Sequence, residues 1–97
     1  MNKITVSCQD KYEAQKFASL IYIKEGKETF IVEILDVIDN ELVISLKDKS
    51  AHSVLLQDST QVEIFTDFIQ SVIEKTEKIV DTRTNENNVE IFKEDLD

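Results

Sequence analysis

This 97-residue chain contains no proline, no tryptophan and one residue each of glycine, cysteine and histidine. The single cysteine, Cys8, cannot form an internal disulfide, which is typical of proteins in a reducing compartment. The single glycine, Gly26, excludes the glycine-rich phosphate loops and the nucleophile elbows that need two or more glycines. Gly26 lies between two apolar segments and is expected to take a positive φ. One cysteine and one histidine are also too few for a structural zinc site.

Few residues in the chain could carry chemistry. Cys8 and His52 would form a catalytic dyad if the fold brought them together. Each lies in a predicted strand among apolar residues, where a free cysteine is usually a small buried hydrophobic side chain. The oxygens of Asp36, Asp39-Asn40 and Glu41 could attract calcium, but they lack the spacing and the glycine of a calcium loop. We therefore expect no catalytic residue, no metal and no cofactor.

The chain also lacks long apolar runs and basic stripes. No apolar run approaches the roughly 18 residues that span a bilayer, and the first residues do not resemble a signal peptide. Twenty acidic against eleven basic residues give a net charge of −9, and such a surface repels nucleic acid and anionic membranes. We expect a protein of the cytoplasm, bacterial or of a phage-infected cell, that binds neither membrane nor nucleic acid directly.

The apolar residues that are present predict an α+β fold. Ile4–Cys8 alternates apolar with small polar residues, as a half-buried strand does. Asp10 and Glu13 are spaced as a capping box for an amphipathic helix over about residues 10–20. Residues 20–24 could continue this helix or form a strand, because short apolar runs are ambiguous in period.

The apolar segments and polar turns in the middle of the chain predict an antiparallel meander that begins at residue 20 or 28 and ends at residue 57. We expect it to belong to a sheet of about four or five strands. Its clearest strands are Glu28–Ile38, Leu42–Leu46 and His52–Gln57. Strict alternation in the first would place Phe30, Val32 and Ile34 on one face and Ile31, Leu35 and Val37 on the other. A strand that is apolar on both faces is either covered on both sides or exposes a patch that marks an interface.

A second helix is predicted over residues 59–78, with Thr60 and Glu63 as a capping box or with Asp58 or Ser59 as the cap. Its apolar stripe consists of Val62, Phe65, Phe68, Ile69, Val72 and Ile73. Glu74 and Lys78 would form an i,i+4 ion pair on the opposite side.

The last residues change in character. Residues 1–80 are predicted to form a single compact domain, and residues 81–97 an acidic, flexible tail, because Asn85–Asn88 is polar and aperiodic. The tail carries six acids and two bases, so it contributes −4 of the net −9. An alternative is that its short apolar stretch Val89–Leu96 docks on a basic, apolar groove of a partner.

Taken together, an acidic surface and the lack of catalytic groups predict a small, non-enzymatic binding protein. Immunity proteins, antitoxins and phage-encoded inhibitors are of this kind, and the expected partner is a protein with a basic surface. The residues expected to contact this partner are Asp36, Asp39 and Glu41 around a predicted two-residue turn at Asp39-Asn40, followed by Glu90, Glu94 and Asp95 in the tail. The alternative is a structural or assembly subunit that self-associates, for instance as a homodimer, through its sheet face.

Overall fold

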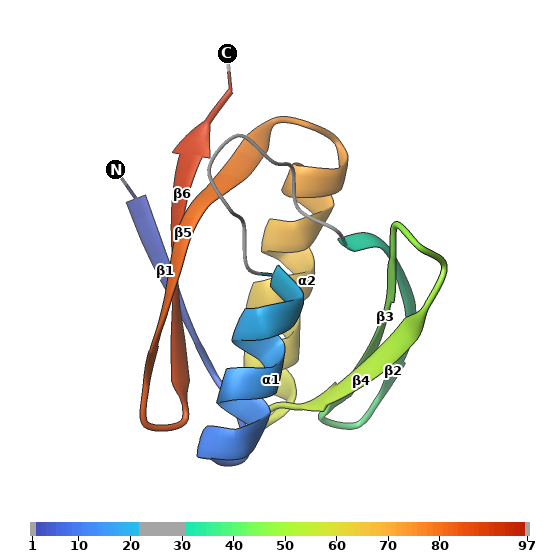
Figure 1. Ribbon diagram of the computed structural model, residues 1–97, viewed down its shortest axis with the longest axis vertical. Coiled ribbons are helices and arrows are strands. Elements are labelled where there is room, and N and C mark those ends of the chain that lie inside the picture. The colour runs from blue at the N-terminus through green and yellow to red at the C-terminus, as the bar shows by residue number, and fades with distance from the viewer. Residues whose placement is uncertain (1, 22–30, 97) are drawn as a thin grey trace.

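The computed structural model, described over residues 2–21 and 31–96, has two helices between two three-stranded antiparallel sheets (Figure 1). The elements in chain order are β1 (Asn2–Ser7), α1 (Lys11–Ile21), β2 (Ile31–Ile38), β3 (Glu41–Leu46), β4 (Ala51–Leu55), α2 (Ser59–Ile73), β5 (Glu77–Asn85) and β6 (Asn88–Asp95). The strand order is β1-β6-β5 in one sheet and β2-β3-β4 in the other. The α+β class, the meander and the two helices are confirmed, but the six strands form two sheets rather than one.

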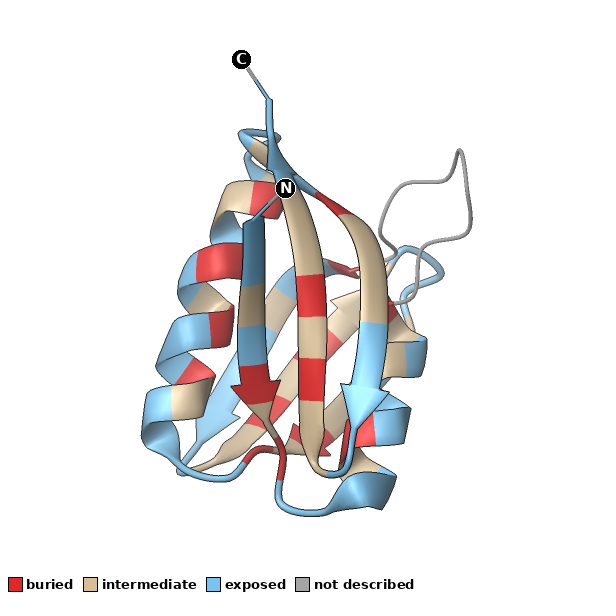
Figure 2. Ribbon diagram, turned by 90° about the vertical axis from the view of Figure 1, so that its left-hand side faces the viewer, coloured by how far each residue is buried: buried red, intermediate tan, exposed pale blue. Residues whose placement is uncertain are grey.

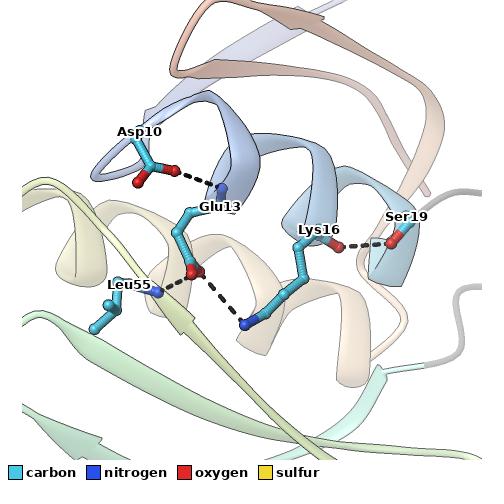
Figure 3. Close-up of polar contacts among 5 residues, drawn as sticks. All are labelled: Asp10, Glu13, Lys16, Ser19 and Leu55. Atoms are coloured by element: carbon cyan, nitrogen blue, oxygen red, sulfur yellow. Dashed lines mark hydrogen bonds and ion pairs between the residues drawn. The ribbon is translucent and has the colours of Figure 1, made fainter.

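Helix α1 begins after Asp10, whose carboxylate accepts a hydrogen bond from the backbone N–H of Glu13 at 2.9 Å (Figure 3). Only this half of the predicted capping box forms, because the Glu13 carboxylate turns to β4 and accepts from the Leu55 N–H at 3.0 Å. The apolar stripe of the helix buries Ala14, Phe17 and Ile21. Residues 20 and 21 are helical, and residues 22–30, with Gly26, lie outside the described residues.

Helix α2 is capped by Asp58, which accepts from the Gln61 N–H at 3.1 Å, so one of the alternative caps is the one used. The helix ends at Ile73, before the predicted end at residue 78. The chain turns there because Lys75 takes a left-handed φ of 63°. The N–H groups of Lys75 and Thr76 return to carbonyls of the last turn, which is the Schellman arrangement that normally places glycine at the left-handed position.

This early end removes the predicted ion pair between Glu74 and Lys78. Glu74 is the last residue of the helical turn, and its carboxylate accepts from the side-chain amide of Gln70 at 3.1 Å. Lys78 lies in β5 and pairs with Glu94 of β6, with 3.4 Å between Nζ and Oε2. The prediction was wrong because a helical spacing was assigned to residues on both sides of a helix end.

Residues 77–95 form the β5–β6 hairpin rather than the flexible tail that we predicted for residues 81–97. Strand β6 is the middle strand of its sheet, between β1 and β5. Val89 and Ile91 are fully buried, and Figure 2 shows buried and half-buried residues alternating along this strand. The polar stretch Asn85–Asn88 closes a two-residue turn, with Glu86 at a φ of 56°. Its polarity is therefore that of a turn, not of a linker.

Strand β2 departs from the strict alternation that we predicted. Its register against β3 shifts between Ile31 and Glu33 and again between Ile34 and Asp36. Val32 and Leu35 are thus the extra residues of two β-bulges. Because of the first bulge, Ile31 and Ile34 both face the core although they are three residues apart.

The core lies between the sheets, where the two helices meet. The rings of Phe17 from α1 and Phe65 from α2 pack edge to face with their centroids 4.6 Å apart. At one corner the sheets are joined by backbone pairing between Cys8 and Leu56, both fully buried. The end of β1 is therefore held against the end of β4, and the chain encloses a single core.

The end of α2 provides a test of backbone strain. We expect Lys75→Gly to raise the free energy of unfolding by about 1 kcal/mol, because glycine adopts a positive φ without a clash of its Cβ. Chemical denaturation measures this change. Lys75→Ala is the matched control, since it removes the same charge but keeps the Cβ. A stabilisation by Lys75→Ala as large as that by Lys75→Gly would contradict the explanation.

Candidate functional site

The turn between β2 and β3 is hydrogen-bonded to Leu56, the residue that follows β4. Asp39 takes the left-handed conformation, with a φ of 54°. Asn40 bonds to Leu56: its side-chain amide donates to the Leu56 carbonyl at 2.7 Å, and its own carbonyl accepts the Leu56 N–H at 2.9 Å. The carboxylates beside this turn are therefore presented from a fixed backbone.

Strand β2 exposes large apolar side chains to solvent. Val32 and Leu35 are each 47% exposed and Ile38 is 53% exposed. Val32 and Leu35 are the two bulge residues, which have no partner of their own in β3, whereas Ile38 pairs with Glu41 at the end of the strand. Such a row of exposed apolar side chains makes this strand the candidate binding surface.

Acidic residues lie among these apolar side chains. Glu33 and Asp36 are exposed on β2, and Glu41 lies directly across from Ile38 in the register with β3. We call Val32, Leu35 and Ile38, together with Glu33, Asp36 and Glu41, the β2 face. Within the described part of the chain, none of its three carboxylates forms an ion pair, and neither does the carboxylate of Asp39 at the turn.

The acids predicted near the end of the chain are in a different situation. Glu90 of β6 pairs with Lys3 of β1, with 3.2 Å between the charged atoms. Glu94 pairs with Lys78, and Asp95 lies at the end of β6 opposite Glu77. These pairs cross between neighbouring strands and partly neutralise the outer face of that sheet.

The six predicted contact residues therefore do not form one site. Asp36, Asp39 and Glu41 come together at the β2–β3 hairpin, whereas Glu90, Glu94 and Asp95 lie in β6 on the other sheet (Figure 1). Of the acids of the β2 face, Asp36 and Glu41 were predicted as contact residues and Glu33 was not, and the possible apolar patch was not assigned to particular residues. No local signal distinguishes a bulge residue such as Leu35 from a core residue, because both are apolar.

Cys8 and His52 have different neighbours in the fold. Cys8 is fully buried where the two sheets join. Burial raises the pKa of its thiol to about 12, and the nearby charges of Glu13 and Asp10 act in the same direction. The Nε2 of His52 contacts the Ser50 hydroxyl at 2.9 Å rather than the thiol. Cys8 is thus protonated at neutral pH and out of reach of solvent.

A cluster of Asp48, Ser50 and His52 was not anticipated from the sequence. The Ser50 hydroxyl lies 2.5 Å from the Asp48 carboxylate and 2.9 Å from His52 Nε2. Hydrogen bonds from the Ser50 hydroxyl, and then from its N–H, lower the pKa of Asp48. In a hydrolytic triad the carboxylate binds the histidine, whereas here it binds the serine and competes for the hydroxyl proton. The cluster stabilises the turn at Lys49, which has a φ of 72°.

Other kinds of site find little support in the described residues. Over residues 2–21 and 31–96, no three His, Cys, Asp or Glu side chains gather closely enough to hold a metal ion. Neither helix described in those ranges is long and apolar enough to cross a membrane. No protein-family model matches the chain, and comparisons with curated proteins and with solved structures give no match.

The reactivity of Cys8 tests its environment directly. We expect native protein to react with iodoacetamide about a thousandfold more slowly than an ordinary thiol at the same pH, because a pKa of about 12 instead of 9.0 lowers the thiolate fraction by that factor. Mass spectrometry measures the alkylated fraction over time. Protein unfolded in urea serves as the control and should react at the ordinary rate, whereas fast alkylation of the native protein would contradict the buried, protonated thiol.

Proposed function

We propose that this chain is a small acidic binding protein that acts, without catalysis, on a protein with a basic surface through its β2 face. An inhibitor or immunity-type protein, or a phage-encoded regulator, works in this way. The single observation that carries the proposal is the combination on the β2 face of exposed apolar side chains with carboxylates that form no ion pair among the described residues.

The two kinds of side chain would contribute differently to binding. Burial of Val32, Leu35 and Ile38 would supply affinity, because apolar contacts slow dissociation. The carboxylates of Glu33, Asp39 and Glu41 would speed the encounter with a basic partner and make it sensitive to salt. A carboxylate that forms no ion pair within the protein gives up no such contact when it binds a basic residue of the partner.

The opposite sheet is the weaker candidate on the same reasoning. Glu90 and Glu94 already interact with Lys3 and Lys78, so a partner would have to compete with these contacts. Arg83 also stacks on Phe92 of that sheet, with 5.0 Å from the guanidinium to the ring centroid. This face presents both signs of charge and no large exposed apolar row.

Self-association through the β2 face is the second candidate function, favoured by the same exposed apolar residues. A two-fold dimer would bring two copies of Glu33, Asp36 and Glu41 together, and none of the six residues that define the face is a base. Like charges placed opposite one another destabilise such a contact. A basic partner therefore fits the face better than a second copy does.

We further propose that the protein works in the cytoplasm of a bacterium or of a phage-infected cell. The support is a buried, free Cys8 in a chain with no other cysteine, which fits a reducing compartment. The high negative charge also argues against contact with nucleic acid or anionic membranes.

A charge-reversal experiment locates the binding surface. The partner is first captured from lysate of the native cell at low salt with the wild-type chain, and its association rate is then measured by stopped flow. We expect the triple variant Glu33→Lys, Asp39→Lys, Glu41→Lys to associate at least about tenfold more slowly and with a smaller salt dependence, because steering by these acids is lost.

The matched control is the triple variant Glu90→Lys, Glu94→Lys, Asp95→Lys, which changes the net charge by the same amount on the other sheet. Its association rate should fall much less. Equal losses from the two variants would show that only the total charge matters and would contradict the β2 face. The apolar part has its own variant, Leu35→Ser, which should raise the dissociation rate and leave the association rate nearly unchanged.

A further inference from the structure

Each of the four outer strands has a backbone N–H that is bound by a side chain instead of by another strand. All four acceptors are carboxylate or amide oxygens, at 2.8 to 3.0 Å. The pairs are the Ser7 N–H of β1 with Gln61, the Val37 N–H of β2 with Asp36, the Leu55 N–H of β4 with Glu13, and the Thr82 N–H of β5 with Asp81.

The ladder geometry explains why these particular N–H groups need an acceptor. In a two-residue hairpin the closing pair exchanges both of its hydrogen bonds, so the next residue directs its N–H away from the partner strand. Ile38 and Glu41 close the β2–β3 hairpin. Counted from the turn, Val37 is therefore the first residue of β2 whose N–H points to the free edge. The same alternation places the Thr82 N–H on the free edge of β5.

Two of the acceptors come from the helices. Glu13 in the first turn of α1 reaches Leu55, where it also lies 3.6 Å from Lys16 Nζ (Figure 3). Gln61 in the first turn of α2 reaches Ser7. These contacts attach a helix to a sheet edge and cover that edge at the same time.

The other two acceptors are local and share one design. Asp36 and Asp81 each accept the N–H of the following residue, and each comes directly after a bulge, at the register shifts Ile34/Asp36 and Ile79/Asp81. A bulge and an acidic side chain on an outer strand are known means of preventing unwanted strand pairing.

The free edge of β2 is the one at which such protection matters most. Val37 and Ile38 are 44% and 53% exposed, whereas β5 has no large exposed apolar residue within Glu77–Asn85. An exposed apolar edge with an unsatisfied N–H is a template for pairing with an identical strand. We propose that Asp36 closes the β2 edge against a second copy of this chain, and that without it two β2 edges pair with each other.

This inference does not depend on the proposed partner, because it concerns a backbone N–H at the edge of β2, although Asp36 and Ile38 also belong to the β2 face. It assigns to Asp36 a role that the total charge does not explain. The role depends on an acceptor oxygen that lies 2.8 Å from the Val37 nitrogen. An uncharged side chain that keeps this oxygen should therefore still close the edge.

The test compares variants by light scattering over a range of protein concentrations, with no partner present. We expect Asp36→Ala to show a mass that rises from monomer towards dimer with concentration, and the Val37 amide to exchange its hydrogen at least about tenfold faster in dilute protein, because its acceptor is gone. Asp36→Asn should stay monomeric, because the amide oxygen can still accept the bond.

Asp81→Ala is the matched control, because it removes the same charge and the same kind of hydrogen bond from an edge without exposed apolar residues. It should remain monomeric. A monomeric Asp36→Ala at every concentration would overturn the proposal. Equal self-association of Asp36→Asn and Asp36→Ala would also overturn it, since charge repulsion would then be the cause. Self-association of Asp81→Ala would show that the effect is not specific to β2.

Discussion

The outward N–H groups of the four outer strands are the constraint around which this fold is arranged. A buried backbone donor without an acceptor costs free energy, and an exposed one invites pairing with another chain. Two separate sheets have four outer strands, so the problem arises four times. The first turns of α1 and α2 supply Glu13 and Gln61, which also fix the helices to the sheets. The remaining two edges rely on aspartates next to bulges.

The same constraint accounts for part of the acidic surplus. Asp10 and Asp58 cap the helices, and Glu13, Asp36 and Asp81 bind strand N–H groups. Other acids form ion pairs within the β1-β6-β5 sheet. Of the described acids whose carboxylates have no hydrogen bond or ion pair among the described residues, Glu33, Asp39 and Glu41 lie on or beside the β2–β3 hairpin. The others, Glu63, Asp67, Glu86 and Asp95, are distributed over α2, the β5–β6 turn and the end of β6. The net charge of −9 is therefore less informative than its division between internal and external roles.

The bulges of β2 connect architecture with the proposed activity. An unbroken strand with Ile31 in the core would direct Glu33 and Leu35 towards the core and Ile34 away from it. Two extra residues, Val32 and Leu35, give β2 an apolar outer row while Ile31 and Ile34 still reach the core. Bulges also distort the strand, so that its edge pairs poorly with a strand of another molecule. One strand can thus offer its face for binding while its edge is closed.

Local physical chemistry in the sequence determined the two helices, their caps at Asp10 and Asp58, and the meander, because each depends on residues a few positions apart. The early end of α2 could not be predicted, because the left-handed residue after the helix is Lys75, whereas helices that end in this way usually have a glycine there. The strand β6 was hidden as well, because the polar turn that joins it to β5 resembles a linker and its other partner, β1, lies at the other end of the chain. The register shifts and the ion pairs follow only from contacts between strands. The sequence by itself therefore named the acidic residues, and the tertiary structure alone decided which of them are already bound within the molecule.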